Sequence, residues 1–542
     1  MKYKQDNWLP HLMEAVPLEA RRNQISMYTI ALEGWRRGLH LKFYSKFENH
    51  KLQIRYSLSN GEKTHHFSGS GGDLITEKAF EICESKSETY SYLTKAGVPI
   101  PLGSKFNGDA ADEDIIQYAK QIKFPLVLKP TNASSGKGVV SNIKNSALLN
   151  EAVEYVRGKL GYREVILEQY VIGEEVRVYV LDNQVLGAGN RRPANVVGDG
   201  VNTIQTLIEK KNEQRKQSPH LYFRPIKIDK DLKNIIQQSN YTIDSIPKNG
   251  EWVYLRKVSN ISKGGEPIDI TEKLSAEQKN IAINAAKAIP GLPHCGVDMI
   301  INSNDNTDVK VIEVNTRPGI GIHLFPIEGT ARDLPKEIID YYFPETKTMD
   351  AKDSNLYFDF ESILNTLKEM STVKVEVPPA GLNQLVAIKY IIEADFKESD
   401  IELKQFHQWM QKRVYAHELH GYINEIHRGK YEMVLAGEDK NKIEEFKEVW
   451  TNNKGFPVNI EKEEEWNNPI KLGFELISDA RMLSVVELES KLKEINNEIR
   501  KADNENRRLE HRMKLMKESK AWKVTKPLRM VTDFRRKRKQ IR

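Results

Sequence analysis

A carboxylate and an amide stand close together at the end of one short apolar run. Residues 309–314 have the apolar character of a buried strand, and Glu313 and Asn315 interrupt one side of it. Because side chains two residues apart on a strand point the same way, these two should face a common site. A second apolar run, residues 296–300, carries one carboxylate, Asp298. We predict that the three side chains form a hard-oxygen site for Mg ions that also hold phosphates; a solvated hairpin is the alternative.

A lysine followed by a loop of small residues lies upstream. Residues 124–130 have the pattern of a strand that delivers Lys129 at its end. The loop over residues 131–140 would let backbone N–H groups approach phosphate closely. It differs from a P-loop because the lysine precedes the loop. The loop residues expected to contact the β- and γ-phosphates are Ser134, Ser135, Gly136 and Gly138.

Several elements must position these groups. We expect residues 74–96 to form a helix that carries Lys86. Gly97 marks the end of this helix. A loop with two cations is expected over residues 190–200. Further strands are predicted at residues 165–170, 176–181, 184–189 and 253–256. A helix is predicted at residues 276–288.

The order of these features resembles the ATP-grasp fold. The resemblance is closest to the ATP-grasp module of cyanophycin synthetases and of fused bacterial glutathione synthetases. It rests on residues 192–200, 259–265 and 313–323 and spans roughly residues 75–345. It implies a ligase that joins a carboxylate to an amine, forms ADP and passes through an acyl phosphate.

The resemblance also implies roles for individual residues. Lys86 and Lys129 would hold the ATP phosphates, and Glu175 would bind the ribose hydroxyls. The adenine would be framed by Glu168, Tyr170 and Val171. Asp298, Glu313 and Asn315 would bind two Mg (or Mn) ions.

One position departs from the pattern of related ligases. In D-alanine ligases an arginine precedes the first metal-binding Asp by two residues, and here that position is Gly296. Arg192, Arg256 or Arg317 would orient the acyl phosphate instead, and the sequence does not choose among them. His323 is a base, a structural histidine or a substrate-contacting histidine.

Composition limits the class of protein. The 542 residues suffice for three or four domains, and two cysteines, Cys83 and Cys295, fit a reducing cytosol. No signal peptide or membrane span is visible, so we expect a cytoplasmic protein. Residues 520–542 hold ten Lys or Arg and one acid, so this tail has a net charge of +9. Because the whole chain has a net charge of +6, the remaining residues carry a net charge of −3. A near-neutral body with a basic tail does not indicate a nucleic-acid partner.

Outside the ATP-grasp region we predict an α/β lead-in (residues 1–75) and a linker (346–380). The βαββαβ order over residues 381–476 predicts a ferredoxin-like domain, so the fold class is α+β and multidomain. This domain resembles acylphosphatase, with Asn424 at the place of the catalytic asparagine. The phosphate-binding arginine of that family is missing, since Phe406 or His407 falls there. We expect a binding or assembly module and no hydrolase.

The C-terminal region has a heptad pattern over residues 485–516, within a segment that we assign to residues 477–519. An asparagine at an a position, Asn506, favours a parallel dimer. The basic tail, residues 520–542, would associate with an anionic membrane or with envelope enzymes at the inner face of the membrane. Three functions therefore compete: a carboxylate–amine ligase, a non-catalytic nucleotide-binding scaffold of an envelope-assembly complex, and an acylphosphatase.

Overall fold

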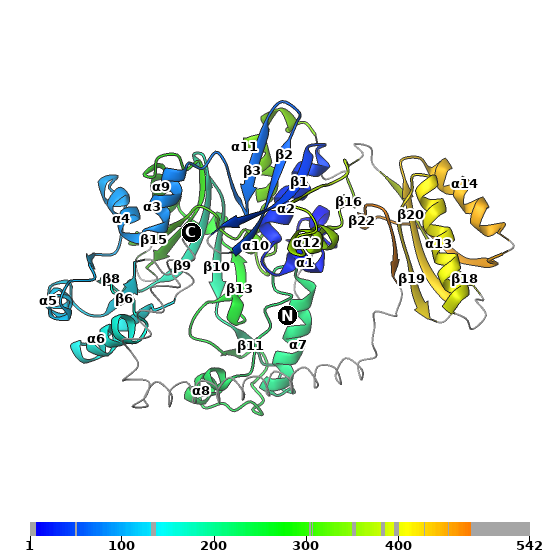
Figure 1. Ribbon diagram of the computed structural model, residues 1–542. Helices are drawn as coiled ribbons and strands as arrows, with labels where there is room; N and C mark the ends of the chain where they lie inside the picture. Colours follow the sequence, from blue (N-terminus) through cyan, green and yellow to red (C-terminus); the bar gives the residue numbers. More distant parts are fainter. Residues whose placement is uncertain are drawn as a thin grey trace, which may run out of the picture.

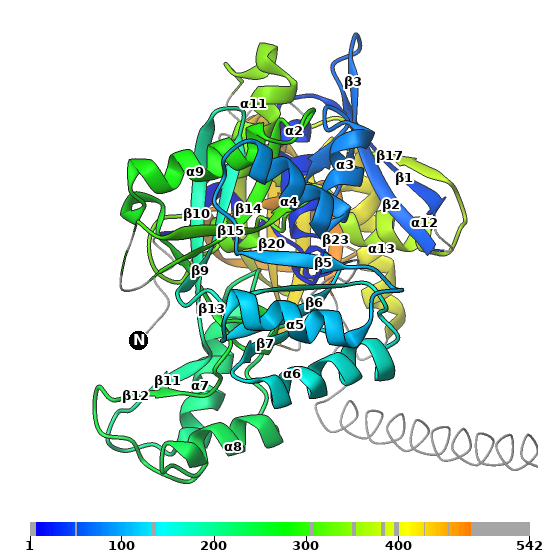
Figure 2. The same ribbon diagram turned by 90° about the vertical axis from the view of Figure 1, so that its left-hand side faces the viewer.

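The chain forms a mixed α/β body and a C-terminal lobe, which lies on the right in Figure 1. In the view of Figure 2, turned by 90°, helices α5 and α6 lie along a small sheet at the front of the body. The structure is a computed structural model. It describes residues 7–48, 51–131, 137–302, 305, 307–349, 354–380, 385–394, 400–427, 429–453 and 455–477.

The N-terminal unit is a helix packed on an antiparallel sheet. Almost every residue of its central helix, α2, is buried, so this helix is a core element and not an amphipathic surface helix. The sheet has the order β17-β1-β2-β3-β4. Its elements are α1 (Leu18–Arg21), α2 (Ile25–Arg36), β1 (His40–Glu48), β2 (Lys51–Ser59), β3 (Thr64–Ser68), β4 (Gly71–Gly72) and β17 (Lys374–Glu376).

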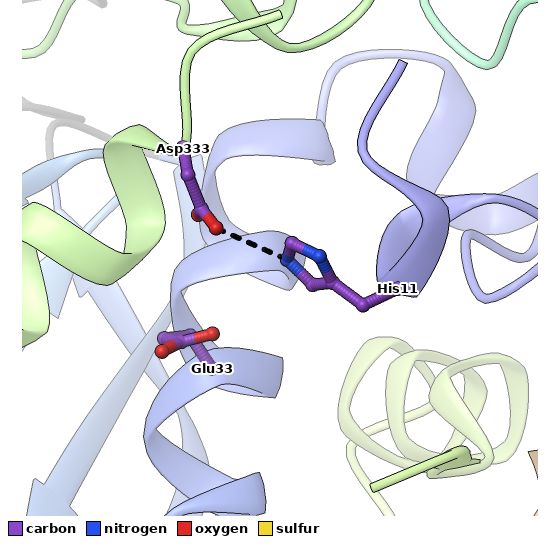
Figure 3. Close-up of side chains that lie close together, drawn as sticks. All are labelled: His11, Glu33 and Asp333. Carbon is purple, nitrogen blue, oxygen red and sulfur yellow. Dashed lines mark ion pairs between the residues drawn. The ribbon is translucent and has the colours of Figure 1, made fainter. Parts of the chain in front are cut away.

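A polar network joins the start of the chain to this helix. His11 Nε2 lies 3.3 Å from Asp333 Oδ2, and Glu33 of α2 lies nearby (Figure 3). Glu33 accepts from Arg37 at 2.6 Å, and the same guanidinium reaches Asp340 at 2.6 Å. The arginine already balances Glu33, so we assign this network a structural role.

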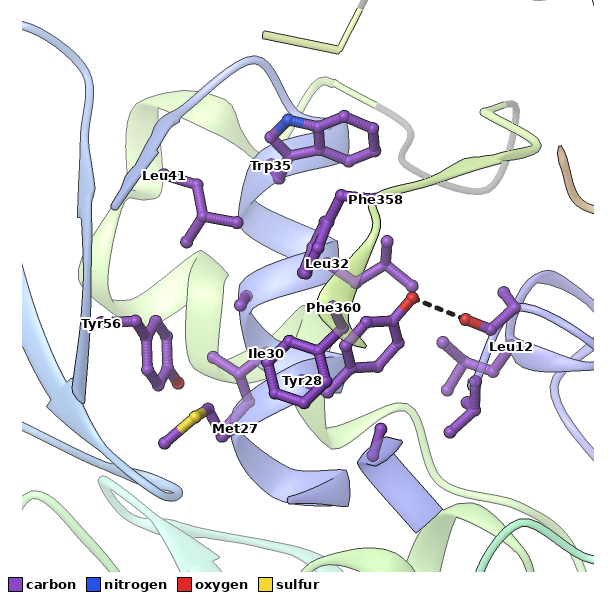
Figure 4. Close-up of a cluster of buried hydrophobic side chains, with 14 of the residues drawn as sticks. Leu12, Met27, Tyr28, Ile30, Leu32, Trp35, Leu41, Tyr56, Phe358 and Phe360 are labelled. Carbon is purple, nitrogen blue, oxygen red and sulfur yellow. Dashed lines mark hydrogen bonds between the residues drawn. The ribbon is translucent and has the colours of Figure 1, made fainter. Parts of the chain in front are cut away.

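Residues 356–376 are part of the N-terminal core, and the linker predicted for residues 346–380 is wrong there. β16 (Leu356–Tyr357), α12 (Phe360–Lys368) and β17 follow one another, and β17 pairs with β1. Phe358 and Phe360 pack against Tyr28 at ring distances of 5.1 and 5.2 Å (Figure 4). The physical reason is burial of these two aromatic rings, which a solvated linker would expose.

A small four-stranded sheet follows in the chain, with strand order β5-β8-β6-β7. Two helices cover it and close a separate apolar core. Its elements are β5 (Gly103–Phe106), α5 (Asp112–Ile122), β6 (Leu126–Pro130), β7 (Val140–Ile143), α6 (Ser146–Val153) and β8 (Val165–Gln169).

The large sheet has the order β13-β10-β9-β14-β15. Valines of β9, β14 and β15 form one apolar face, and helices α3, α4 and α9 pack near it. Cys83 and Cys295 belong to this core, and burial raises the pKa of the Cys83 thiol to about 12. The strands are β9 (Glu174–Leu181), β10 (Gln184–Arg192), β13 (Glu266–Asp269), β14 (His294–Ile301) and β15 (Val309–Asn315). The neighbouring helices are α9 (Ala276–Lys287), α10 (Gly321–Leu324) and α11 (Leu334–Tyr342).

The helix predicted over residues 74–96 is two helices. α3 (Glu77–Glu84) ends at Ser85, and α4 (Lys86–Lys95) begins directly after it. Ser85 is extended and its hydroxyl accepts from the backbone N–H of Glu88, which is an N-cap. The break puts Lys86 at the first position of α4.

An insertion between β10 and β13 forms a projecting unit with its own small core. Part of the loop predicted over residues 190–200 is a strand, because β11 pairs with β12. The elements of the insertion are β11 (Asn195–Val197), α7 (Ile204–Gln217), α8 (Lys230–Gln238) and β12 (Trp252–Tyr254).

The C-terminal lobe has two helices on a five-stranded sheet with order β21-β18-β20-β19-β23. Met433 and Leu435 of β20 face the helices, whereas Val434 and Ala436 join the N-terminal core. The lobe is therefore packed on the body. Its elements are β18 (Val386–Ala394), α13 (Asp400–Ala416), β19 (His420–His427), β20 (Lys430–Gly437), α14 (Lys440–Thr451), β21 (Val458–Glu465), β22 (Ile470–Lys471) and β23 (Phe474–Ile477).

The heptad over residues 485–516 and the basic tail over residues 520–542 lie outside the described residues. None of the helices that the structure describes has both the length and the apolar character needed to cross a bilayer.

Candidate active site

One row of polar residues crosses the large sheet, one from each of four strands. Asp298 lies directly opposite Glu313 on one side and opposite Arg177 on the other. Arg177 lies opposite Gly189, and Gly189 lies opposite Asp269. Because directly opposed residues of antiparallel strands share a face, all of these point to the face away from the valine core. We call this the active face.

A β-bulge in β15 separates the polar from the apolar part of that strand. The register with β14 shifts between Asp298 and Met299, which leaves Ile312 as the extra residue. Without the shift, Val311 would share the face of Glu313. With it, Val309, Val311 and Val314 are all buried in the core. The bulge thus aims Glu313 and Asn315 at the active face, as their two-residue spacing predicts.

The carboxylate of Asp298 is held by an arginine that the sequence analysis did not propose. Arg177 Nε lies 2.7 Å from Oδ1 and Arg177 Nη2 lies 2.6 Å from Oδ2. The Asn315 amide donates to Oδ2 at 3.2 Å, which leaves its own oxygen available as a metal ligand. Burial works to lower the pKa of Arg177, but the charge and hydrogen bonds of Asp298 outweigh it and raise that pKa.

The geometry explains why no arginine stands at position 296. A Cβ on Gly296 would lie 2.6 Å from Cβ of Pro318 and 3.9 Å from Cδ of Arg177. A long side chain there would clash with the proline, so the neighbouring strand β9 supplies the guanidinium. One sequence feature marks Arg177 as a candidate, although it does not place the residue beside Asp298: Arg177 is the charged residue inside the apolar run 176–181.

The three arginines proposed from the sequence lie elsewhere. Arg192 leaves β10 on the side opposite to the active face and pairs with Glu266 and Glu328. Arg256 binds Asp229 at 2.7 Å in the insertion. Arg317 lies two residues beyond Asn315; it donates to Ser68 at 3.0 Å and its guanidinium lies 4.8 Å from the Phe80 ring centre. The structure does not bring Arg192 or Arg256 to Asp298, whereas Arg317 stays beside the loop that follows β15.

Lys86 lies beside the carboxylates of the row. Its ammonium group lies 3.5 Å from Glu313 Oε1, because the Ser85 cap starts α4 at this point. The row thus continues with a cation beyond Glu313.

Lys129 and Glu168 form a buried ion pair in the small sheet. Lys129 Nζ lies 2.6 Å from Glu168 Oε1, and the two residues are only 6% and 4% exposed. The Tyr90 hydroxyl accepts from Lys129 at 2.9 Å and lies 3.1 Å from Glu168 Oε2 and 3.3 Å from the Ile312 carbonyl of β15. Tyr90 therefore links the lysine of the small sheet to the strand that carries Glu313.

Three further residues expected to bind nucleotide, Tyr170, Val171 and Glu175, lie in or beside the connection from the small to the large sheet. Glu175 pairs with Arg191 at 2.6 Å, and the backbone N–H of Tyr170 donates to Pro125 at 2.9 Å. Val171 is the next residue after Tyr170 in the chain. Gly138 has φ +71°, a conformation that favours glycine. Ser134, Ser135 and Gly136 lie outside the described residues.

His323 lies on the active face over two glycines. A Cβ on Gly187 would lie 3.0 Å from His323 Nδ1, and one on Gly189 would lie 3.7 Å from Cε1. The ring is 1% exposed, and neither ring nitrogen has a hydrogen-bond partner among the described residues. Burial, with the positive charge of Arg177, lowers the pKa of His323 to about 3, so the imidazole is neutral.

Two family models match this part of the chain. The D-ala D-ala ligase C-terminus matches residues 94–246, and the RimK-like ATP-grasp domain matches residues 236–341. Together the two matches cover residues 94–341, so this segment is similar to ATP-grasp ligases. The matched segment contains the small sheet, the insertion and the row of polar residues on the large sheet.

Curated relatives match over a wider segment. The glutathione biosynthesis bifunctional protein GshAB of Clostridium perfringens is 32% identical over 334 residues, which is 59% of this chain and 41% of the relative. The cyanophycin synthetase of Trichormus variabilis is 30% identical over 303 residues, which is 55% of this chain and 33% of the relative. The chain thus spans less than half the length of these two relatives. The crystal structure of a bifunctional glutathione synthetase from Pasteurella multocida is 28% identical, covers 56% of this chain and 42% of its own, and has a TM-score of 0.44.

Proposed function

We propose that the chain is an ATP-dependent, ADP-forming ligase that joins a carboxylate to an amine. The observation that carries this proposal is the row across the large sheet, in which Arg177 and Lys86 flank Asp298 and Glu313. Two carboxylates could hold a divalent metal, and the two flanking cations could bind phosphate oxygens beside it. The relatives that match the same segment support the ligase class.

The chain's own residues would act mainly by charge and position. A carboxylate is a poor electrophile, so phosphoryl transfer from ATP would first make an acyl phosphate, which the amine then attacks. Lys129 would leave Glu168 to hold a phosphate, since an ammonium neutralises the transferring group. Arg177 would bind the substrate carboxylate beside Asp298, because a guanidinium binds planar oxyanions through two donors.

The residues present fit a magnesium site. Two carboxylates and the free oxygen of the Asn315 amide, all from adjacent strands, are the ligand types that Mg prefers. When bound, the metal would supply charge neutralisation at the phosphates. Mn would use the same donors.

The test is ADP release by the full chain with MgATP, screened over amino acids and peptides as acids and amines. We expect release that depends on an acid and on the metal, and its loss in Glu313→Gln with the fold retained. Glu337→Gln, on α11 with a side chain that is 44% exposed, is the matched control. Wild-type release by Glu313→Gln at ordinary Mg would refute the site assignment.

We further infer that the C-terminal lobe is a ferredoxin-like binding or assembly module. Its βαββαβ order and the strand order β21-β18-β20-β19 support this topology. Phe406, at the place of the missing phosphate-binding arginine, is buried in the core of the lobe. The full chain should not hydrolyse benzoyl phosphate; hydrolysis that is lost in Asn424→Ala would show an acylphosphatase.

A further inference from the structure

The Tyr90 side chain lies where the two sheets of the site meet. Tyr90 comes one turn after Lys86 on α4, so both side chains leave the same face of this helix. Lys86 lies 3.5 Å from Glu313 on the large sheet, whereas Tyr90 contacts Lys129 and Glu168 on the small sheet. The two sheets have separate apolar cores, so this face of α4 is a polar connection between them.

The Tyr90 hydroxyl accepts one hydrogen bond and donates another. It accepts from the Lys129 ammonium group at 2.9 Å, and this group lies 5.0 Å from the centre of the Tyr90 ring. Its single proton has two acceptors within reach, Glu168 Oε2 at 3.1 Å and the Ile312 carbonyl at 3.3 Å. Burial and then the charge of Glu168 raise the pKa of Tyr90 well above its usual value, so the hydroxyl keeps this proton. We assign the proton to Glu168, since a carboxylate is a stronger acceptor than a carbonyl.

The Glu168 carboxylate therefore has two partners, and it would lose one of them when a phosphate takes Lys129. Glu168 is almost fully buried, and a buried carboxylate whose cation is removed is strongly unfavourable. Tyr90 would stay beside it, because α4 packs on the core of the large sheet through Leu93 and does not depend on Lys129 for its position. A hydrogen bond to a charged group contributes more than one between neutral groups. The hydroxyl thus matters more after the lysine has left than before.

We propose that Tyr90 is a positioning residue of the ligase, whose hydroxyl holds the Glu168 carboxylate while Lys129 is transferred to the phosphates of ATP. This inference rests on the proposed ligase function and on the role proposed there for Lys129. Without the hydroxyl, the release of Lys129 costs more free energy, so ATP binds more weakly. A phenylalanine would keep the ring and its packing, so its effect should fall on the nucleotide-bound state.

A double-mutant cycle in the full chain tests this role through the Kd for MgATP, measured calorimetrically below the lowest melting temperature of the set. Tyr90→Phe should raise this Kd about tenfold, which is the loss of one hydrogen bond to a charged group. Tyr92→Phe, the same chemical change two residues further along α4, is the matched control and should change the Kd less than about twofold.

The second arm of the cycle removes the charge that the hydroxyl holds. Glu168→Gln leaves a neutral amide, so Tyr90→Phe added to this variant should change the Kd for MgATP less than about twofold. A purely structural role of Tyr90 would give the same factor with Glu168 and with the glutamine. Equal factors, or a Kd that Tyr90→Phe leaves unchanged, would overturn the inference.

Turnover gives a readout that needs only the single variant. Because the hydroxyl acts when the nucleotide takes Lys129, Tyr90→Phe should raise KM for MgATP about tenfold and lower kcat less than about twofold. A loss in kcat as large as the rise in KM would indicate a distorted site and would overturn the inference.

The Kd and the turnover separate this inference from the ligase function. The expected coupling between Tyr90 and Glu168, without ADP release from any acid, would support the role of Tyr90 in nucleotide binding and contradict the ligase function. ADP release with equal factors in the two arms of the cycle would overturn the role of Tyr90 and leave the ligase function standing.

Discussion

The ammonium group of Lys129 lies 2.6 Å from Oε1 of Glu168, and both side chains are almost fully buried. The lysine that we propose to hold a phosphate is therefore held by a carboxylate in this structure. The carboxylate holds the lysine in place, and removing one partner of such a buried pair costs about 3–5 kcal/mol.

The first prediction follows from this pair. Lys129→Met and Glu168→Gln should each lower the free energy of unfolding by about 3 kcal/mol, because each leaves one buried charge unpaired. The double variant should lose clearly less than the sum of the two. Urea unfolding gives the free energy of unfolding of the wild type, the two single variants and the double variant. Added MgATP should raise the stability of Glu168→Gln, but not that of Lys129→Met or of the double variant. Additive losses would show that the pair is not coupled.

The second prediction concerns the arginine beside Asp298. Arg177→Met should lower kcat/KM for ADP formation by about a hundredfold or more, which corresponds to about 2.7 kcal/mol of transition-state stabilisation. Arg192→Met, on the opposite side of β10, should lower it less than tenfold. Mg should raise the melting temperature of Arg177→Met more than that of the wild type, because the metal replaces the lost positive charge next to Asp298. Equal losses in the two variants would refute the special role of Arg177.

The third prediction concerns acid stability. The pKa of His323 is about 3 in the folded chain, against about 6.5 when unfolded. Between these values the unfolded chain binds a proton that the folded chain does not, so stability falls as the pH drops from about 6.5 towards 3. His323→Leu should reduce this slope by up to about 1.4 kcal/mol per pH unit. His40→Leu, at an exposed position, is the control, and an unchanged slope in His323→Leu would contradict the assignment.

The fourth prediction tests the heptad of residues 485–516. A chain truncated after Ser484 should be monomeric in sedimentation and should no longer pellet with anionic vesicles, because two basic tails bind a charged surface far better than one. The full chain should be dimeric and should pellet. A dimeric truncated chain would assign dimerisation to another surface.

The juxtaposition of the residues proposed for the metal site could be predicted from the sequence because it depends on local patterns. Glu313 and Asn315 follow from strand alternation, and Asp298 follows from a single carboxylate in a short apolar run. Arg177 could not be placed, because its role depends on the pairing of β9 with β14, which are 120 residues apart in the chain and whose register no local pattern reveals.

The same limit applies to the predicted linker. The pairing of β17 with β1 joins residues more than 300 positions apart, so a polar stretch was expected to be a connection. Phe358 and Phe360 were the local signs of burial. The break between α3 and α4 could have been predicted, since Ser85 with Glu88 three residues later has the spacing of a capping box.

The central claim is an acyl phosphate made with release of ADP. Hydroxylamine attacks such an intermediate, so it should replace the amine when the correct acid is supplied. The measurement is the stoichiometry of hydroxamate, ADP and phosphate formed by the full chain with MgATP. We predict one hydroxamate per ADP and per phosphate, and loss of all three in Arg177→Met. AMP and pyrophosphate as products would instead indicate an adenylate and would contradict the mechanism.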